Sequence, residues 1–274
     1  MRILFASDFH GTIPYFDAFA KLARRLKPDA LLLGGDLFDN SSPVEIAPVA
    51  QRQTAEGWFK EWCDGAPAPV YWIAGNHEWR TVTDPPARAG TYVGERMVAL
   101  GDWDLVGFSF CSPTPYWLID HERPEEAPNR HEPRFRCYAS TGDKAELVEK
   151  PEEWLAKRPT LASMLRELPR PRSWRKTIFM AHNPPFDSGL DLRYGNLPVG
   201  SSDIRNFILA TKPAISLHGH IHEAPILTGK PMHKVGRTWG FNAGRDRDHQ
   251  GLRALWIDPD KPEEHVLHGG KPIA

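Results

Sequence analysis

Five consecutive residues near the C-terminal end, His218-Gly219-His220-Ile221-His222, carry three imidazole side chains. The apolar residues directly before them, 214–217, predict a short buried strand, so the histidines lie where a strand leaves its sheet. In an extended segment, side chains two positions apart point the same way, and we expect His220 and His222 to face one point. Neutral imidazole is a common ligand of transition metals. An isolated His-x-His pair is more often part of a surface loop, so the rest of the chain decides between these interpretations.

Polar residues follow four further apolar segments in the same way. The segments are residues 3–6, 30–33, 70–73 and 177–181, and such short apolar runs are typical of strands buried on both faces of a largely parallel sheet. In sheets of this kind, ligands collect beyond the carboxyl ends of the strands, so the polar side chains should meet at one edge. These residues are Asp8 and His10, Asp36 and Asp39, Asn76 and His77, and His182.

The types of these residues indicate a metal centre. Taken singly, each has an ordinary explanation as a helix cap, a turn residue or a loop histidine. Five strand ends that all carry nitrogen or oxygen donors, with no thiolate among them, suit manganese, iron, zinc or nickel ions. The donors suffice for two divalent metal ions that share one carboxylate. Two ions about 3.5–4 Å apart are the apparatus for in-line attack on phosphorus.

A strand–helix–strand rhythm connects these ends and predicts an α/β fold. Pro14 should open a helix that runs to about residue 26, and a second helical region should end near Trp62. Residues 102–110 predict a strand of a second sheet, a helix is expected over 202–209, and 235–241 and 252–257 should supply closing strands. We expect a single domain over residues 1–274 with an insertion at about 116–173, which includes a helix from Pro151 to Leu168.

The composition excludes several classes of protein. The 274 residues are 41% hydrophobic and 25% charged, which is ordinary for a soluble globular protein. A net charge of -1 gives no general attraction to nucleic acid or membrane, and the one basic cluster, residues 170–176, is interpreted as a solvated loop. The three scattered cysteines should be reduced thiols, and no apolar run approaches membrane-spanning length. Because the first residues run straight into a strand, there is no room for a signal peptide, and we expect a cytoplasmic protein.

The full set of motifs, in this order, resembles the calcineurin-like metallophosphoesterase superfamily. Within it, Val199-Gly200-Ser201, Lys212-Pro213 and residues 219–223 resemble the small single-domain phosphoesterases of bacteria and archaea. The resemblance implies a four-layer αββα sandwich of two mixed β-sheets flanked by helices, with the metal site at the C-terminal ends of the strands. The motifs that carry it span nearly the whole chain: Asp8-x-His10, Gly35-Asp36-x-x-Asp39, Gly75-Asn76-His77-Glu78, His182 and Gly219-His220-x-His222.

The resemblance also implies a role for each residue. Asp36 would bridge both metals, because a carboxylate has two oxygens and a negative charge. His77 would be the general acid that protonates the leaving oxygen. Asp39 would accept a hydrogen bond from His77 and raise its pKa, with a helix cap as the alternative, and Glu78 has no assigned role. The remaining ligands divide into Asp8, His10 and His222 for the first metal and Asn76, His182 and His220 for the second.

The function implied is the hydrolysis of a phosphate ester by a hydroxide that bridges two divalent metal ions. A small-molecule phosphodiester is the first choice, because Asn40 stands where the protein phosphatases of the superfamily carry an arginine that clamps phosphate. His218 stands where many relatives have a small residue, and we expect it to pack or to support the ligands. A phosphomonoesterase, a nuclease and a protein-binding scaffold that has lost catalysis are the alternatives. The near-neutral charge disfavours nucleic acid, the complete ligand set disfavours a scaffold, and no membrane partner or oligomeric state is predicted.

Overall fold

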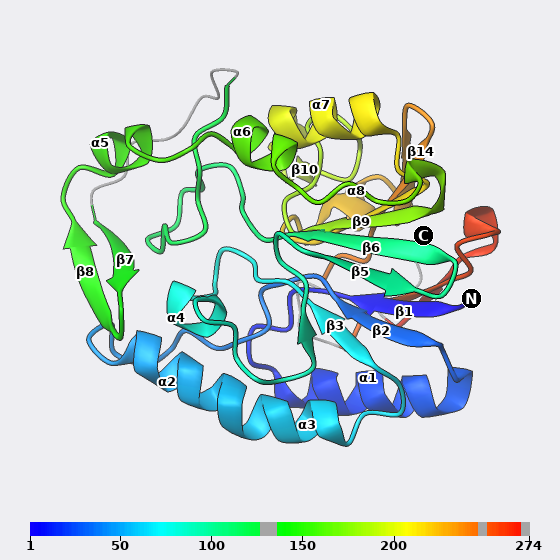
Figure 1. Cartoon of the computed structure of the whole chain (residues 1–274), viewed down its shortest axis with the longest axis horizontal. Coiled ribbons are helices and arrows are strands. Elements are labelled where there is room, and N and C mark those ends of the chain that lie inside the picture. Colours follow the sequence, from blue (N-terminus) through cyan, green and yellow to red (C-terminus); the bar gives the residue numbers. More distant parts are fainter. Residues whose placement is uncertain (127–135, 246–250, 270–274) are drawn as a thin grey trace.

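Two six-stranded β-sheets face each other, and helices cover the outer side of each, so that the chain forms four layers (Figure 1). The computed structural model describes residues 1–126, 136–245 and 251–269. The first sheet has the strand order β16-β15-β1-β2-β3-β4, and the second has the order β13-β14-β12-β9-β6-β5. The αββα sandwich that the resemblance implies is confirmed.

Both sheets are mixed, with parallel strands in the middle and antiparallel strands toward the edges. Strands β1 to β4 are parallel, as are β6, β9, β12 and β14, whereas β15, β16, β5 and β13 run antiparallel to their neighbours. The first sheet consists of β1 (Ile3–Ala6), β2 (Ala30–Leu33), β3 (Val70–Trp72), β4 (Thr91–Tyr92), β15 (Ala254–Ile257) and β16 (Val266–His268). The second consists of β5 (Met97–Leu100), β6 (Trp103–Phe108), β9 (Thr177–Ala181), β12 (Ile215–His218), β13 (Met232–Val235) and β14 (Thr238–Asn242).

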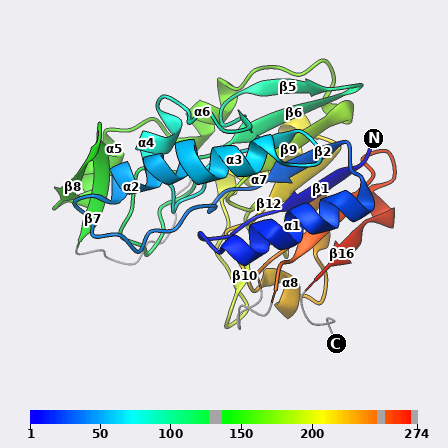
Figure 2. The ribbon, with the colours of Figure 1, turned by 90° about the horizontal axis from the view of Figure 1, so that it is seen from below.

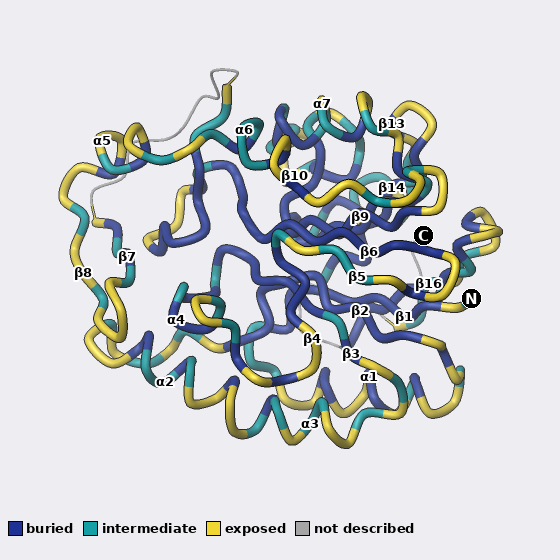
Figure 3. The backbone as a smooth tube through the Cα atoms, in the orientation of Figure 1, coloured by how far each residue is buried: buried dark blue, intermediate teal, exposed yellow. Residues whose placement is uncertain are grey.

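Alternate side chains of β1 enter two different cores. Ile3 and Phe5 point between the sheets, where they join side chains of β9 and β12, whereas Leu4 and Ala6 point toward the helices. This follows from the two-residue repeat of a strand. All four residues are fully buried, as Figure 3 shows for the central strands of both sheets. The strand is therefore apolar throughout because both of its faces are covered.

Long helices cover the first sheet and shorter ones the second (Figure 2). Over the first sheet lie α1 (Ile13–Leu26), with Pro14 in its first turn as predicted, and a continuous helical segment whose aromatic Phe59 packs beside Phe16. That segment comprises α2 (Ala47–Thr54), the π-helical turn η1 (Ala55–Phe59) and α3 (Lys60–Asp64). The second sheet packs against α6 (Leu161–Arg166) and α7 (Ser202–Thr211). Among the described residues, no helix is both long and apolar enough to cross a bilayer.

The segment between β6 and β9 lies largely outside the two sheets. It contains the hairpin β7 (Cys137–Thr141) and β8 (Lys144–Val148), then α5 (Pro151–Ala156), α6 and the 3₁₀ turn η2 (Trp174–Lys176). The single helix expected from Pro151 to Leu168 is wrong, because two short helices flank an interruption that contains Pro159. Proline lacks the N–H that a continuous helix requires and disfavours helical geometry in the residue before it. The insertion at about 116–173 and the single domain stay predictions.

The remaining elements are short. A turn at Gly236, where φ is 62°, divides the expected strand 235–241 into β13 and β14. The hairpin β10 (Leu192–Arg193) and β11 (Leu197–Pro198) follows β9, and the last turns are α4 (Arg80–Thr83), α8 (Ala224–Leu227) and η3 (Pro262–Glu264). Of these elements, α4 follows the loop with Asn76 and His77, the hairpin β10–β11 follows His182, and α8 follows His222.

The chain after β2 passes very close to the chain after β3 at Gly35. Gly35 has a φ of 94°, and a Cβ at this position would lie 2.7 Å from the nitrogen of Gly75 and 2.8 Å from Nδ1 of His182. A side chain is therefore excluded both by backbone conformation and by space. Glycine allows strand ends from both sheets to meet where the polar residues gather.

We expect Gly35→Ala to lower the free energy of unfolding by about 2–4 kcal/mol, because the added methyl group both strains the backbone and overlaps its neighbours. Urea unfolding followed by circular dichroism measures this loss. The matched control is Gly101→Ala, where φ is 60° but nothing lies within 4 Å of the added Cβ. The control should lose only the backbone contribution of about 1 kcal/mol. Equal losses in the two variants would contradict the importance of the close approach.

Candidate metal centre

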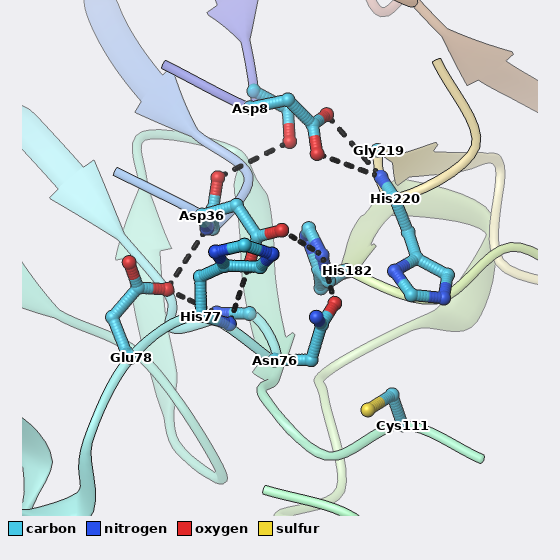
Figure 4. A network of polar contacts seen from close by, with 12 residues as sticks. Asp8, Asp36, Asn76, His77, Glu78, Cys111, His182, Gly219 and His220 are labelled. Atoms are coloured by element: carbon cyan, nitrogen blue, oxygen red, sulfur yellow. Dashed lines mark hydrogen bonds and ion pairs between the residues drawn. The ribbon is translucent and has the colours of Figure 1, made fainter. Parts of the chain in front are cut away.

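The predicted ligands come together just beyond the ends of β1, β2, β3, β9 and β12 (Figure 4). Four of them have left-handed backbone conformations, with φ of 63° at Asp8, 47° at His10, 52° at Asp36 and 67° at His220. Such values are uncommon for residues other than glycine and cost free energy that the surrounding structure must supply. The sharp turns bring each side chain back over the edge of the sheets.

One group of donors consists of Asp8, His10 and His222, whose ligand atoms all lie within 4.8 Å of one another. Nε2 of His222 is 3.3 Å from Oδ1 of Asp8 and 3.3 Å from Nε2 of His10. Two imidazole nitrogens that face each other at this distance repel through their lone pairs unless a cation or a proton lies between them. This group therefore fits a divalent ion.

A second group consists of Asp36, His182 and His220. Nε2 of His182 lies 3.3 Å from Oδ2 of Asp36 and 3.3 Å from Oδ1 of Asn76. Because Nδ1 of His182 lies 2.8 Å from the carbonyl oxygen of Gly34, this nitrogen carries the proton in the neutral ring. The other nitrogen then presents a lone pair to two oxygen acceptors. A cation among these three atoms resolves the conflict, so this group also fits a metal ion.

Asp36 lies close to both groups of donor atoms. Its Oδ2 lies 3.8 Å from Nε2 of His10 as well as 3.3 Å from His182, and a third group of donor atoms within 4.8 Å joins His10, Asp36 and His77. The carboxylate therefore stands between the two groups, and Figure 4 shows it among Asp8, His182 and His220. The assignment of these residues as ligands stays a prediction, and the structure places all seven in one cluster.

Burial and the carboxylates of Asp8 and Asp36 determine whether the imidazole rings are protonated. Burial lowers the pKa of His10 and of His220 to about 3, so both rings are neutral and able to donate a lone pair. At His182, burial favours the neutral form, but the Asp36 carboxylate raises the pKa to about 9. A proton at this site thus occupies the place that a metal cation would take. Burial also opposes ionisation of Asp36, yet the neighbouring histidines hold its pKa well below its ordinary value.

The extended geometry expected for His220 and His222 is wrong. Strand β12 ends at His218, and the chain then turns so that His220 and His222 enter different groups. The backbone N–H of His220 donates to Asp8, with distances of 3.0 and 3.2 Å to its two oxygens. A Cβ on Gly219 would lie 2.0 Å from Oγ of Ser7, so only glycine allows this turn. Two imidazoles from one motif can therefore serve two metals.

His218 itself is fully buried and lies in neither group. Its Nδ1 is 2.9 Å from the carbonyl oxygen of Ala181 and 3.2 Å from that of Asn183. The ring therefore holds the end of β12 against the residues on either side of His182. This placement agrees with the packing role expected from the sequence.

Asp39 does not make the contact with His77 that the resemblance implies. Its carboxylate accepts a hydrogen bond from Ser41, and no hydrogen bond to His77 is present in the part of the chain that the structure describes. Asp39 also caps no helix, because α2 begins only at Ala47. The backbone oxygen of His77 instead accepts hydrogen bonds from Asn40 Nδ2 at 2.8 Å and Gln51 Nε2 at 3.0 Å. Asp39 is exposed.

Glu78 is the functional residue that the sequence left without a role. Its fully buried carboxylate accepts four backbone hydrogen bonds, from Asp36 at 2.9 Å, Leu37 at 2.8 Å, Phe38 at 3.1 Å and Gly75 at 2.6 Å. Burial, together with the Asp36 carboxylate, raises the pKa of Glu78 to about 7. The side chain joins the loop after β2 to the loop after β3. Its position two residues after Asn76 was the only signal in the sequence.

Glu78→Gln should lower both the free energy of unfolding and the affinity for divalent metal. The NH₂ group of glutamine would replace one carboxylate oxygen and would face backbone N–H groups, which are also donors. A buried donor without an acceptor costs about 1–3 kcal/mol, and the lost loop contacts also displace Asp36. Urea unfolding at pH 8 and metal titration measure the two effects. The control is Glu95→Gln, a half-buried carboxylate that accepts one backbone hydrogen bond, from Ser109. The control should keep its metal affinity, and a Glu78→Gln variant that also keeps it would contradict the positioning role.

Comparison with known proteins supports the fold and identifies the family. The fold is similar to TT1561 of Thermus thermophilus, with a TM-score of 0.54, 16% identity and 98% of each chain covered. It is also similar to a dimetal phosphatase from Danio rerio, with a TM-score of 0.53, 11% identity, and 98% of this chain and 95% of that chain covered. No curated protein matches the sequence significantly. The family model described as calcineurin-like phosphoesterase matches residues 1–224. The chain therefore belongs to the calcineurin-like phosphoesterase family and is a metal-dependent hydrolase of phosphate esters.

Proposed function

We propose that this enzyme hydrolyses phosphodiesters at a two-metal centre in which Asp36 is shared. The observation that carries the proposal is the position of Asp36 between the group of Asp8, His10 and His222 and the group of His182 and His220. A carboxylate can offer one oxygen to each cation. When bound, the two cations would polarise the phosphate and neutralise the charge that develops on it. Manganese, iron, zinc and nickel all suit these nitrogen and oxygen donors.

His77 is positioned to deliver a proton to the leaving oxygen. Its backbone N–H donates to Oδ1 of Asp36 at 2.9 Å, and its carbonyl oxygen is held by Asn40 and Gln51. The backbone is therefore fixed on both sides while the half-buried ring remains beside the centre, 4.5 Å from the ring of His10. Such positioning favours proton transfer without requiring the ring to be a ligand.

Tyr116 extends the site on the side of His77. The two rings lie 5.9 Å apart in an edge arrangement, and the residue is 51% exposed. Because His77 would protonate the leaving oxygen, the leaving group should lie near this phenol ring. An aromatic wall there suits an organic leaving group better than an inorganic one.

The surroundings of Asn40 favour a diester over a monoester. Asn40 Nδ2 donates to His77, and Oδ1 of Asn40 accepts from Trp79 Nε1 at 2.9 Å, so both ends of its amide serve the framework. The position therefore provides no cation for the second negative charge of a phosphomonoester dianion. A diester carries a single negative charge and has less need of one. Phosphomonoesterase and nuclease activities are the competing outcomes of a substrate panel, and the cytoplasmic location stays a prediction.

The shared carboxylate can be tested by metal analysis. Asp36→Asn removes the negative charge between the two groups and should cost both metal ions, so that content falls from two toward none, and hydrolysis of bis(p-nitrophenyl) phosphate is lost. The control is Asp104→Asn, which removes a buried carboxylate paired with Arg172 at the start of β6, the end of the strands opposite the ligands, and should keep both ions. Two ions retained at full affinity in Asp36→Asn would show that this residue is not shared.

The role of His77 can be separated from metal binding by varying the leaving group. His77→Ala should leave the metal content nearly intact while kcat falls about 10²–10⁴-fold for a poor leaving group such as phenolate. For p-nitrophenolate, which needs no proton, the loss should be much smaller. Loss of a metal ion would instead make His77 a ligand, as its donor atom beside His10 and Asp36 allows. Equal losses for both leaving groups would make it a positioning residue.

A further inference from the structure

A pocket lies at the end of the strands opposite the metal centre. It has a volume of about 430 Å³, within the range of small-molecule sites. The residues that line it include two indoles and four cations: Trp103, Trp239, Arg175, Lys176, Lys212 and Arg237. They come from segments that are far apart in the sequence, so the pocket is a product of the fold.

Strand direction explains why these segments meet. Strands β6, β9, β12 and β14 are parallel neighbours, and Trp103 begins β6, Lys176 precedes β9, and Trp239 lies at the start of β14. His182 and His220 follow the opposite ends of β9 and β12. The metal ligands therefore stand where the chain leaves these strands, and the cations stand where it enters them.

The pocket is strongly positive in a chain of net charge -1. Asp260, the acidic residue in its lining, is bonded to Lys176. Arg175, Lys212 and Arg237 form no ion pair with any described residue. Three exposed cations around one pocket repel each other, and a bound anion would relieve that repulsion.

The walls are apolar and aromatic as well as charged. Nζ of Lys176 lies 4.7 Å from the ring centre of Trp103, and Nζ of Lys234 lies 4.0 Å from that of Trp239. These ammonium contacts fix both indoles. Trp239 is only partly buried, so part of its ring borders the pocket. A ligand that matches the whole pocket needs negative charge at one end and an apolar, preferably flat, group at the other.

We propose that this pocket binds a nucleoside phosphate, with the phosphate on Arg175, Lys212 and Arg237 and the base against the part of the Trp239 indole that Lys234 leaves uncovered. Guanidinium groups bind phosphate through paired, charge-assisted hydrogen bonds, and an indole offers an aromatic surface on which any base can pack. Part of the basic segment 170–176, interpreted from the sequence as a solvated loop, thus becomes one wall of a site. The ligand would be a free nucleotide or the phosphorylated end of a single-stranded nucleic acid.

The test is isothermal titration calorimetry on protein freed of metal with EDTA, so that the metal centre does not contribute. The probes are ADP, pyrophosphate, adenosine and a 5′-phosphorylated tetrathymidylate. ADP or the oligonucleotide should bind with a dissociation constant below about 1 mM and weaken as salt is raised. Tighter binding of ADP would assign the site to free nucleotides, and tighter binding of the oligonucleotide would assign it to nucleic acid ends.

Two variants locate the binding. Arg175→Glu/Arg237→Glu should weaken binding at least tenfold, since each cation makes a charge-assisted contact. The control, Arg88→Glu/Lys144→Glu, changes the net charge equally at exposed positions elsewhere and should keep the affinity. Trp239→Leu should weaken ADP but not pyrophosphate, and thermal unfolding confirms that each variant is folded.

Three results would overturn the proposal: no binding of any probe, the same affinity in Arg175→Glu/Arg237→Glu as in the native protein, or pyrophosphate or adenosine binding as tightly as ADP. Because these measurements are made without metal, they are independent of whether the enzyme proves to be a phosphodiesterase.

Discussion

Three carboxylates, those of Asp8, Asp36 and Glu78, are buried in one cluster, and the rest of the site compensates for their charge. A buried carboxylate is costly unless charged partners or hydrogen-bond donors replace its water. Four backbone N–H groups surround Glu78, the N–H of His220 contacts Asp8, and His182 faces Asp36. Bound cations would neutralise the negative charge that these contacts leave uncompensated. Metal binding to such a site should therefore stabilise the fold while it prepares the enzyme for its substrate.

The groups that compensate for these buried charges are placed by backbone conformations that few residues adopt. Asp8, His10, Asp36 and His220 all have positive φ, and each such residue costs about 1–3 kcal/mol. The neighbouring glycines, Gly35 and Gly219 among them, give the chain the room that these turns require. Two facing sheets hold the strand ends rigidly enough to maintain the strain. A loop without this support would relax, and its donors would separate.

Much of the fold and of the candidate site was predictable because it depends on local patterns. The apolar segments 30–33 and 177–181 are the strands β2 and β9, and the polar residues after the strands lie together at one edge, with the exception of Asp39. The interruption of the helix expected over 151–168 was not predicted, because the apolar pattern continues across Pro159. The edge strands β4 and β16 have two and three residues, too few to show a repeat.

The details that failed are those that depend on where a backbone turns. His220 and His222 would face one point if β12 continued, but the positive φ of His220 separates them. Nothing in the types of neighbouring residues indicates that Glu78 binds backbone N–H groups, because backbone donors carry no sequence signal. Asp39 shows the reverse case: its motif position suggests a partner for His77, and the structure gives it Ser41. Side-chain types indicate which residues are candidate ligands, whereas backbone dihedral angles decide which of these residues lie together in one group.

The parallel strands also separate two kinds of charge. Nitrogen and carboxylate donors follow the strands, and Arg175, Lys176, Lys212 and Arg237 line a pocket at the opposite edge. Those cations are too far along the strands to attract a phosphate ester to the metal centre through water that contains salt, where charges act over about 8 Å. Bound metal ions would then have to supply the attraction for the substrate. Because buried carboxylates would offset much of that positive charge, a centre of this kind would suit a singly charged diester better than a dianion, in line with the phosphodiesterase activity that we propose from the surroundings of Asn40.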